Sequence, residues 1–305
     1  MSVLLQSFSM PKVSKIPDRW MLAIALLIFS AVPACQRPAV TTGPAITTGT
    51  ETVSPNPRTN GSESEHLAFG NLSNATTDPA DQDNFLILGN GSAFSYNDSR
   101  GTINWVSWRT ERSDLGDSIP RPDFRPDPRL PDNFKRIGYY DYSGSGFDRG
   151  HMVPSADRFA SKELNEETFL MTNIVPQSGA LNQYPWNKLE SFARGQAWRG
   201  SDLYQAAGVY GDQGSLKGKI VVPTNCWKVI VVVPRGKRIE ANDPRMRVFA
   251  VDMPNDPGIE NVRWERYLTT IRTIESKTGL DFFSTFPAEL QDRIENRRDT
   301  RSGKP

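Results

Sequence analysis

The chain has 305 residues, with 36 Lys and Arg against 35 Asp and Glu and a formal net charge of +1. This balance excludes a global field that would draw the whole chain onto a polyanion, so any attraction to nucleic acid must be local. A hydrophobic content of 37% can build a substantial core, while two histidines and two cysteines exclude a multi-histidine zinc site and a disulfide framework.

The N-terminal residues 1–34 have the pattern of a signal peptide. Three basic residues precede the apolar run "MLAIALLIFSAVPA", which spans 21–34. The run is shorter than the ~20 residues of a membrane span, and a buried core helix is the alternative. "VPA" before Cys35 resembles a lipobox, in which this cysteine would carry a lipid anchor; simple cleavage after Ala34 is the other outcome. We therefore expect an extracytoplasmic protein, secreted or periplasmic, that is either free or anchored through Cys35.

Composition divides the rest of the chain. Residues 35–65 are rich in Thr, Pro, Gly and Ser and predict a flexible tether. Patterned sequence from 66 to 298 predicts one domain, and 299–305 forms a C-terminal tail.

Within this domain, short β-branched runs and helical periodicity alternate irregularly, which predicts an α+β fold with helices packed on a mixed sheet. The surroundings of Cys226 favour a small buried hydrophobe over a reactive thiol. Strands are expected at 85–90, 103–110, 169–177, 202–211, 219–223, 226–234 and 246–254, and helices at 187–198, 260–279 and 287–297.

The segment "FDRGH" contains Asp148, Arg149, Gly150 and His151. A neutral imidazole can take a proton from water near pH 7, and a nearby carboxylate can set its tautomer. An arginine offers a fixed fork for phosphate oxygens, and glycine lets the backbone turn between them. These groups suit attack of water on a phosphodiester; the alternative is a loop histidine beside a surface Asp–Arg pair.

The scarcity of histidine and cysteine also limits the metal. Any bound ion must have oxygen ligands, and Mg²⁺ fits because it keeps several waters and accepts few protein ligands.

The nine residues "DRGHMVPSA", 148–156, resemble the signature of the DNA/RNA non-specific endonucleases, which include secreted bacterial nucleases and mitochondrial endonuclease G. The similarity extends over about Leu67 to Arg297 and implies a ββα-metal fold. It includes Asn173, Asn182 and the helix that follows, at the family's spacing.

The resemblance implies a function for each matching residue. His151 would be the general base, Asn182 the direct side-chain ligand of Mg²⁺, and Glu190 an acceptor for metal-bound water. Asp148 would orient or tune His151, and Arg149 would hold the phosphate.

Other residues have implied substrate contacts. Arg194 would also hold the phosphate, and Arg121 would supply a further contact, with Arg125 close enough to be the residue instead. Asn173 is assigned to substrate binding, although a structural function at a strand end is the alternative.

Each helix residue has a structural alternative. Glu190 and Arg194 stand four apart, the spacing of a surface ion pair. Asn182 could cap the helix, since asparagine is a good N-cap residue.

The sequence hypothesis is a Mg²⁺-dependent endonuclease, with Mn²⁺ as an alternative ion, that cleaves DNA and RNA with little sequence preference and leaves 5′ phosphates. Contacts mostly to phosphate would explain the lack of base specificity. The alternatives are a surface nucleic-acid-binding lipoprotein with a silent site and a phosphodiesterase for another ester.

Overall fold

The computed structural model describes residues 64–299, so the predicted signal peptide, Cys35 and all but the last two residues of the predicted tether lie outside the described residues. A seven-stranded sheet in the order β1-β2-β3-β6-β9-β10-β11 forms the centre, and every neighbouring pair is antiparallel. The strands are β1 (Phe85–Leu88), β2 (Ala93–Asn97), β3 (Thr102–Thr110), β6 (Ser201–Tyr210), β9 (Asn225–Pro234), β10 (Arg247–Pro254) and β11 (Leu268–Thr269).

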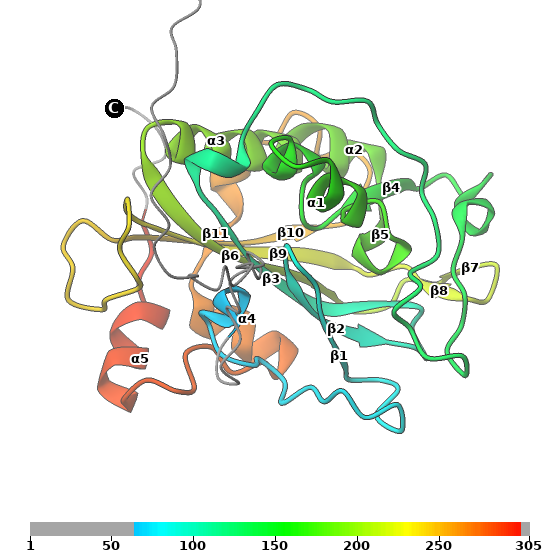
Figure 1. Cartoon of the computed structure of the whole chain (residues 1–305), viewed down its shortest axis with the longest axis horizontal. Coiled ribbons are helices and arrows are strands. Elements are labelled where there is room, and N and C mark those ends of the chain that lie inside the picture. Colours follow the sequence, from blue (N-terminus) through cyan, green and yellow to red (C-terminus); the bar gives the residue numbers. More distant parts are fainter. Residues whose placement is uncertain (1–63, 300–305) are drawn as a thin grey trace, which may run out of the picture. The chain divides into compact units, whose positions relative to one another are not determined.

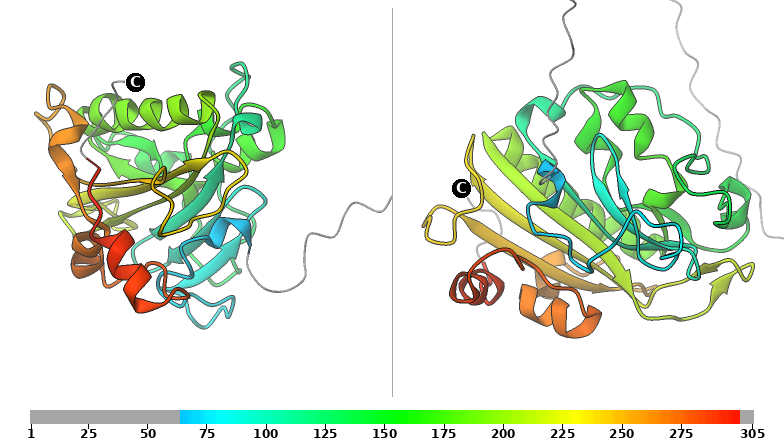
Figure 2. Two further views of the ribbon diagram at one scale, coloured as in Figure 1. Left: turned by 90° about the vertical axis from the view of Figure 1, so that its left-hand side faces the viewer. Right: turned by 60° about the horizontal axis from the view of Figure 1, so that its bottom comes forward.

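Helices cover both faces of this sheet. In Figure 1, α1 (Lys162–Glu167), α2 (Gly179–Leu181) and α3 (Asn187–Trp198) lie above it, and α4 (Ile271–Thr278) and α5 (Ala288–Glu295) lie below. Figure 2 shows the same layers from two other directions. The predicted α+β class is confirmed, and the sheet is largely antiparallel as expected.

The long central strands are apolar on both faces because both faces are covered. Along β9, Ile230 and Val232 belong to the core under α3, while Val231 and Val233 belong to the core over α4 and α5. Alternate side chains of a strand point to opposite faces, so one β-branched run supplies two cores. Cys226 lies on the α3 side as a free, fully buried thiol, and burial raises its pKa to about 12, as the prediction of an inert residue requires.

Two small hairpins stand outside the main sheet. One pairs β4 (Asp148–His151) with β5 (Ile174–Gln177), and the other pairs β7 (Ser215–Leu216) with β8 (Ile220–Val221). Gly150 is required in the first hairpin, since a Cβ there would lie 2.0 Å from Gln177 Oε1. Residues Asp148–His151 therefore form a strand and not a loop, and the Gln177 side chain packed against Gly150 explains the glycine.

Two predicted elements differ from the structure. The helix expected over 260–279 is confined to its second half; the first half is a 3-10 turn at Trp264–Tyr267 followed by β11. Its apolar residues match helical spacing, but Leu268 instead pairs with Val251 at the sheet edge. The strand expected over 169–177 begins only at Ile174, because Met171–Asn173 form a 3-10 turn.

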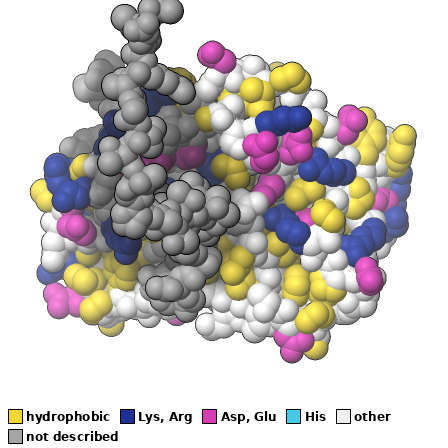
Figure 3. All heavy atoms as spheres, in the orientation of Figure 1, with side chains coloured by type: hydrophobic (Ala, Val, Ile, Leu, Met, Phe, Trp, Pro, Cys, Tyr) yellow, Lys and Arg dark blue, Asp and Glu magenta, His cyan; other side chains and the backbone are white. Residues whose placement is uncertain are grey.

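On the right-hand part of the face seen in Figure 3, basic and acidic side chains are interspersed. Between residues 64 and 299, no helix has the length and apolar character to span a membrane.

Candidate active site

A cleft of about 240 Å³ opens between the β4–β5 hairpin and the start of α3. Residues far apart in the sequence meet there because β4 ends at His151 while the helical segment from α2 to α3 passes beside it. The lining residues are His151, Pro154, Ser155, Ala156, Phe159, Asn182, Asn187, Glu190 and Arg194. The structure thus brings together four of the predicted site residues.

His151 is held between two aromatic rings. Its ring centroid lies 5.4 Å from that of Phe124 and 4.8 Å from that of Phe169. Burial, and then the positive charge of Arg121, lower the pKa of His151 to about 3, so the imidazole is neutral at pH 7. Its Nε2 is buried and makes no hydrogen bond to any described residue. A neutral imidazole that lines a cleft is the form that a general base needs.

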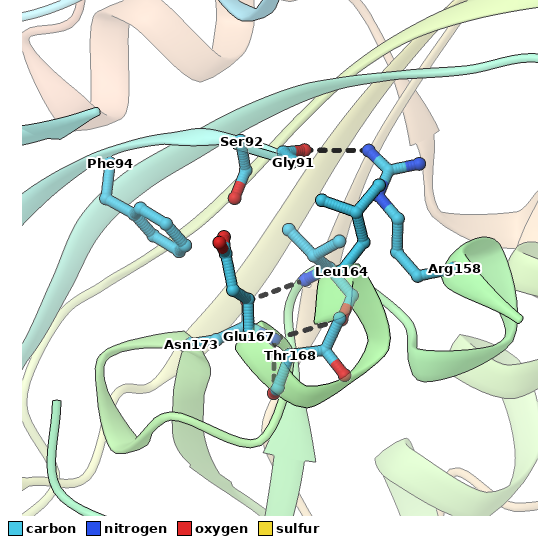
Figure 4. A pocket seen from close by; sticks show the side chains of 9 residues that line it. Gly91, Ser92, Phe94, Arg158, Leu164, Glu167, Thr168 and Asn173 are labelled. Carbon is cyan, nitrogen blue, oxygen red and sulfur yellow. Dashed lines mark hydrogen bonds between the residues drawn. The ribbon is translucent and has the colours of Figure 1, made fainter. Parts of the chain in front are cut away.

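Asn173 fixes the backbone directly after His151. Its Oδ1 accepts from Val153 N (2.9 Å), and its Nδ2 donates to Val153 O (3.0 Å) and Thr168 O (2.9 Å). The side chain is fully buried, and Figure 4 shows it against Thr168. These hydrogen bonds favour the structural alternative for Asn173 over substrate binding, because its amide is used by the backbone.

Asp148 has other partners than the predicted one. Its Oδ2 accepts from Asn182 Nδ2 and Gln183 Nε2, both at 2.9 Å. Asp148 and His151 stand three residues apart on one strand, so their side chains leave opposite faces. Asp148 therefore orients Asn182 in this structure, and no hydrogen bond between Asp148 and His151 occurs in the described part of the chain.

Asn182 is presented by a wide helical turn. Residues Asn182–Trp186 form a π-helix between α2 and α3, with Pro185 inside it. Single π turns inside helices are frequent at functional sites. Asn182 has helical dihedrals, and the cap of this helical segment is Ser178, whose Oγ accepts from Leu181 N. The N-cap alternative for Asn182 is therefore excluded, and the amide Nδ2 is used by its hydrogen bond to Asp148.

Glu190 is paired with a lysine that the sequence analysis missed. Lys228 rises from β9, is fully buried, and places Nζ 3.6 Å from Glu190 Oε1. Its Nζ also lies 4.7 Å from the Trp186 ring centroid and 5.0 Å from that of Trp108. Burial raises the pKa of Glu190 and lowers that of Lys228, and each charge partly offsets the shift of the other. The pair holds the carboxyl group at the cleft wall.

The buried carboxylate of Asp157 orients Arg194. Arg194 Nη1 lies 3.4 Å from Asp157 Oδ1, and Asp157 Oδ2 accepts from Trp108 Nε1 and Gln205 Nε2, both at 3.2 Å. Because Arg194 pairs with Asp157, the alternative of a solvent-exposed Glu190–Arg194 pair does not describe this helix. Asp157, like Lys228, was missed by sequence reasoning.

The three remaining arginines take different positions. Arg121 lies over the rings of Phe124 and Phe169 (5.1 and 5.4 Å), and its charge acts on His151. Arg125 Nη2 lies 3.8 Å from Glu166 Oε2, away from the cleft lining. Between the two, Arg121 is the arginine near the histidine, while Arg125 is paired elsewhere. Arg149 also lies outside the cleft lining and stacks on Tyr139 at 3.8 Å.

A second cavity, drawn in Figure 4, lies behind Asn173 and has a volume of about 10 Å³. It holds at most about one water molecule, and Arg158 closes one side by donating to Gly91 O at 2.7 Å. This cavity does not compete with the cleft as a site.

The cleft residues fit an oxygen-ligated cation. Asn182 Oδ1 and the Glu190 carboxyl line one space with room for several waters. In the part of the chain that the structure describes, no three His, Cys, Asp or Glu side chains gather to hold a metal ion. A cation that keeps most of its waters is the kind that such a donor set can accept.

A hairpin and a helix that carry these groups beside an antiparallel sheet are the arrangement of the ββα-metal nucleases, and the chain has this fold. Residues 70–289 match the family model described as "DNA/RNA non-specific endonuclease". The chain belongs to the DNA/RNA non-specific endonuclease family and is a phosphodiester-hydrolysing endonuclease.

Individual relatives agree with this membership. The chain is 43% identical over 238 residues to a nuclease of Nostoc sp. (strain PCC 7120), covering 77% of this chain and 86% of the relative. It is 34% identical over 200 residues to human mitochondrial endonuclease G, covering 60% of this chain and 64% of that protein. A crystal structure of an EndoG/EndoGI complex superposes with a TM-score of 0.61 at 23% identity, covering 74% of this chain and 93% of that one, which supports the fold.

Proposed function

We propose that this endonuclease hydrolyses DNA and RNA with little sequence preference, that it depends on Mg²⁺, that His151 is its general base, and that its products carry 5′ phosphates. The observation that supports this most directly is the neutral imidazole of His151, which lines one cleft together with Asn182, Glu190 and Arg194.

The chain's own residues divide the reaction between them. The His151 imidazole takes a proton from water as that water attacks phosphorus, and the aromatic rings on either side keep the imidazole in place. Arg194, oriented by Asp157, and Arg121, close to His151, bind the phosphate oxygens and stabilise the added negative charge. Arg149 contacts the nucleic-acid strand just outside the cleft.

Asn182 Oδ1 would hold Mg²⁺ directly, and Glu190 would accept hydrogen bonds from waters bound to the ion. When bound, Mg²⁺ supplies Lewis-acid stabilisation of the phosphate and the leaving oxygen. Mn²⁺ has the same oxygen preference and is expected to substitute. Asp148 and Lys228 position Asn182 and Glu190 from behind.

We further propose that the protein acts outside the cytoplasm, secreted or periplasmic, with Cys35 as its lipid attachment point if it is anchored. This rests on residues 1–35 of the sequence. A mass measurement of the mature N-terminus tests it: a diacylglyceryl adduct on Cys35 supports anchoring, while a free Cys35 terminus supports simple cleavage.

The decisive experiment is plasmid nicking by purified protein with Mg²⁺ and with chelator, followed by end analysis of the products. His151→Ala is expected to reduce Mg²⁺-dependent nicking by at least about 100-fold, since a positioned general base contributes roughly 10²–10⁴-fold. His66→Gln, which changes the other histidine, is the control and should retain activity, with folding of both variants checked by thermal melting. Wild-type nicking rates in a folded His151→Ala protein would refute the base assignment, and 3′-phosphate ends would refute the proposed product.

A further inference from the structure

Two tyrosines are exposed on the surface in the turn that precedes β4, the strand that ends at His151. In the 3-10 turn Tyr139–Tyr142, Tyr139 is 46% and Tyr140 79% exposed, while Tyr142 is buried. The rings of Tyr139 and Tyr140 lie edge to face with centroids 5.4 Å apart. Two adjacent aromatic faces in solvent, unlike single scattered ones, indicate a binding surface.

These tyrosines are connected to the cleft by alternating cationic and aromatic groups. The Arg149 guanidinium lies 3.8 Å from the Tyr139 ring centroid and donates from Nη2 to Tyr139 O at 2.6 Å. On its other side, Arg149 lies 5.8 Å from the Phe124 centroid, which is 5.4 Å from the His151 ring. The row Tyr140–Tyr139–Arg149–Phe124 therefore ends at the residue proposed to activate water.

The β7–β8 hairpin adds positive charge beside this row. Lys217 Nζ donates to Tyr140 O at 2.6 Å, and Lys219 Nζ contacts Asp141 Oδ1 at 2.8 Å. Both lysines are exposed and tie the hairpin to the tyrosine turn. Lys217 and Lys219 both act on the carboxylate of Asp141, and Arg149 contacts Tyr139 of the same turn. These three cations against that carboxylate make the turn locally positive, although the chain as a whole is nearly neutral.

We propose that Tyr139, Tyr140, Arg149, Lys217 and Lys219 form a stacking subsite for single-stranded nucleic acid next to the cleavage site. Aromatic faces bind unpaired bases of any sequence, and interspersed lysines and arginines bind the phosphates between them. In a duplex the bases are stacked on each other and offer no free face, so an unpaired strand is the ligand that this surface fits. The inference rests on the proposed function only in that the bound strand is also the substrate.

The test is equilibrium binding in chelator, where no metal-dependent cleavage occurs whichever residue is the base. Fluorescence anisotropy with a labelled single-stranded oligonucleotide and a blunt duplex of the same length compares Tyr140→Ala with the parent. Loss of one stacked base is expected to weaken single-strand binding by about 5- to 100-fold, while Tyr140→Trp retains it and duplex binding stays within about twofold. Trp198→Ala removes another exposed ring, 49% exposed at the end of α3, and is the matched control.

A second variant tests the charge. Lys217→Ala should reduce the salt dependence of single-strand binding by about 0.7 in the log–log slope, the loss of one phosphate contact. Lys237→Ala, an exposed lysine in the β9–β10 loop, should leave the slope unchanged.

Several results would overturn the subsite: unchanged single-strand binding in Tyr140→Ala, equal weakening of duplex and single strand, or equal loss in Trp198→Ala. On active enzyme, Tyr140→Ala should raise KM for a single-stranded substrate more than for a duplex of the same length. Failure of the nuclease mechanism would appear separately, in the His151→Ala nicking assay.

Discussion

Each face of the central sheet carries a buried cluster of charged side chains, and one of them lines the cleft that contains His151. On the α3 side, Lys228 pairs with Glu190 and Asp157 pairs with Arg194. Glu190 lines the cleft that also contains the neutral His151, and Asp157 is connected to this cleft through Arg194.

On the opposite side, Arg272 of α4 lies 3.2 Å from Glu275 and 2.6 Å from Glu295 of α5. Glu295 is fully buried, and burial, followed by the neighbouring Glu275, raises its pKa to about 7. Both clusters raise the pKa of a carboxyl group, yet the second joins two helices and its residues do not line the cleft that contains His151. A perturbed carboxyl therefore marks a site only where a cavity and an unpartnered base accompany it.

Among the variants that compare the two clusters, Lys228→Met should give the largest effect on stability and nicking. Removing one partner of a buried ion pair typically costs about 3–5 kcal/mol, and nicking should fall by at least about tenfold because Glu190 loses its support. Loss of the lysine charge also raises the pKa of Glu190 further, so the acid limb of the nicking pH profile should move to higher pH, which a purely structural loss would not cause. Urea unfolding and nicking rates against pH measure the two effects.

The control for that variant is Lys277→Met, which breaks the contact of Lys277 with Asp252 Oδ2 near α4. It should change stability by less than about 1 kcal/mol, because Lys277 is half exposed, and leave nicking unchanged. Full activity and an unshifted profile in Lys228→Met would show that Glu190 works without its buried partner.

Glu295→Gln tests the opposite face and should change the pH dependence of stability without changing nicking. The folded protein binds the Glu295 proton up to about pH 7, against an ordinary value of 4.5. The contribution of Glu295 to the free energy of unfolding is therefore fully present below pH ~4.5. It is lost as pH rises towards 7, at up to about 1.4 kcal/mol per pH unit. The variant, neutral at all pH values, should lack this decline when urea midpoints are compared between pH 5 and 8.

Glu289→Gln, an exposed acid on the same helix α5, should keep the wild-type decline. An unchanged slope in Glu295→Gln, or a loss of nicking, would remove the distinction between the two clusters.

Arg121→Gln should have the smallest of these pH effects. Burial is the main cause of the low His151 pKa and the charge of Arg121 is the second. Removal of Arg121 should therefore raise the pKa of His151 and move the acid limb of the nicking pH profile to higher pH, by up to about one pH unit. Arg125→Gln should not move it, because Arg125 lies beside Glu166. A shift in Arg125→Gln alone would reverse the assignment of the two arginines.

Local patterns predicted much of the fold correctly. The helix expected at 187–198 has those bounds in α3, and the strand expected at 226–234 differs from β9 by one residue. In both segments most residues prefer the same secondary structure, and both segments have clear ends. The segment 260–279 failed because spacing alone does not distinguish an edge strand from a helix when the neighbouring strand supplies the pairing.

Lys228 shows what a sequence signal can suggest without explaining. A lysine inside the apolar run "CWKVIVVVP" is conspicuous, and its position in the alternation places it on the same face as Cys226 and Ile230. Its partner, Glu190, stands in a helix 38 positions earlier in the chain. Only the packing of α3 on β9 brings the two together.

The sequence by itself determined the family, the α+β class and the residue types of the chemistry, because these depend on local pattern and on a signature of contiguous residues. The tertiary structure decided which partner each of those residues has: Asp148 for Asn182, Asp157 for Arg194, and Asn173 for the backbone at Val153. It also decided that His151 is neutral and that two tyrosines stand exposed in the turn before β4. Burial, charge contacts and exposed faces arise when distant segments pack together, and no local pattern contains them.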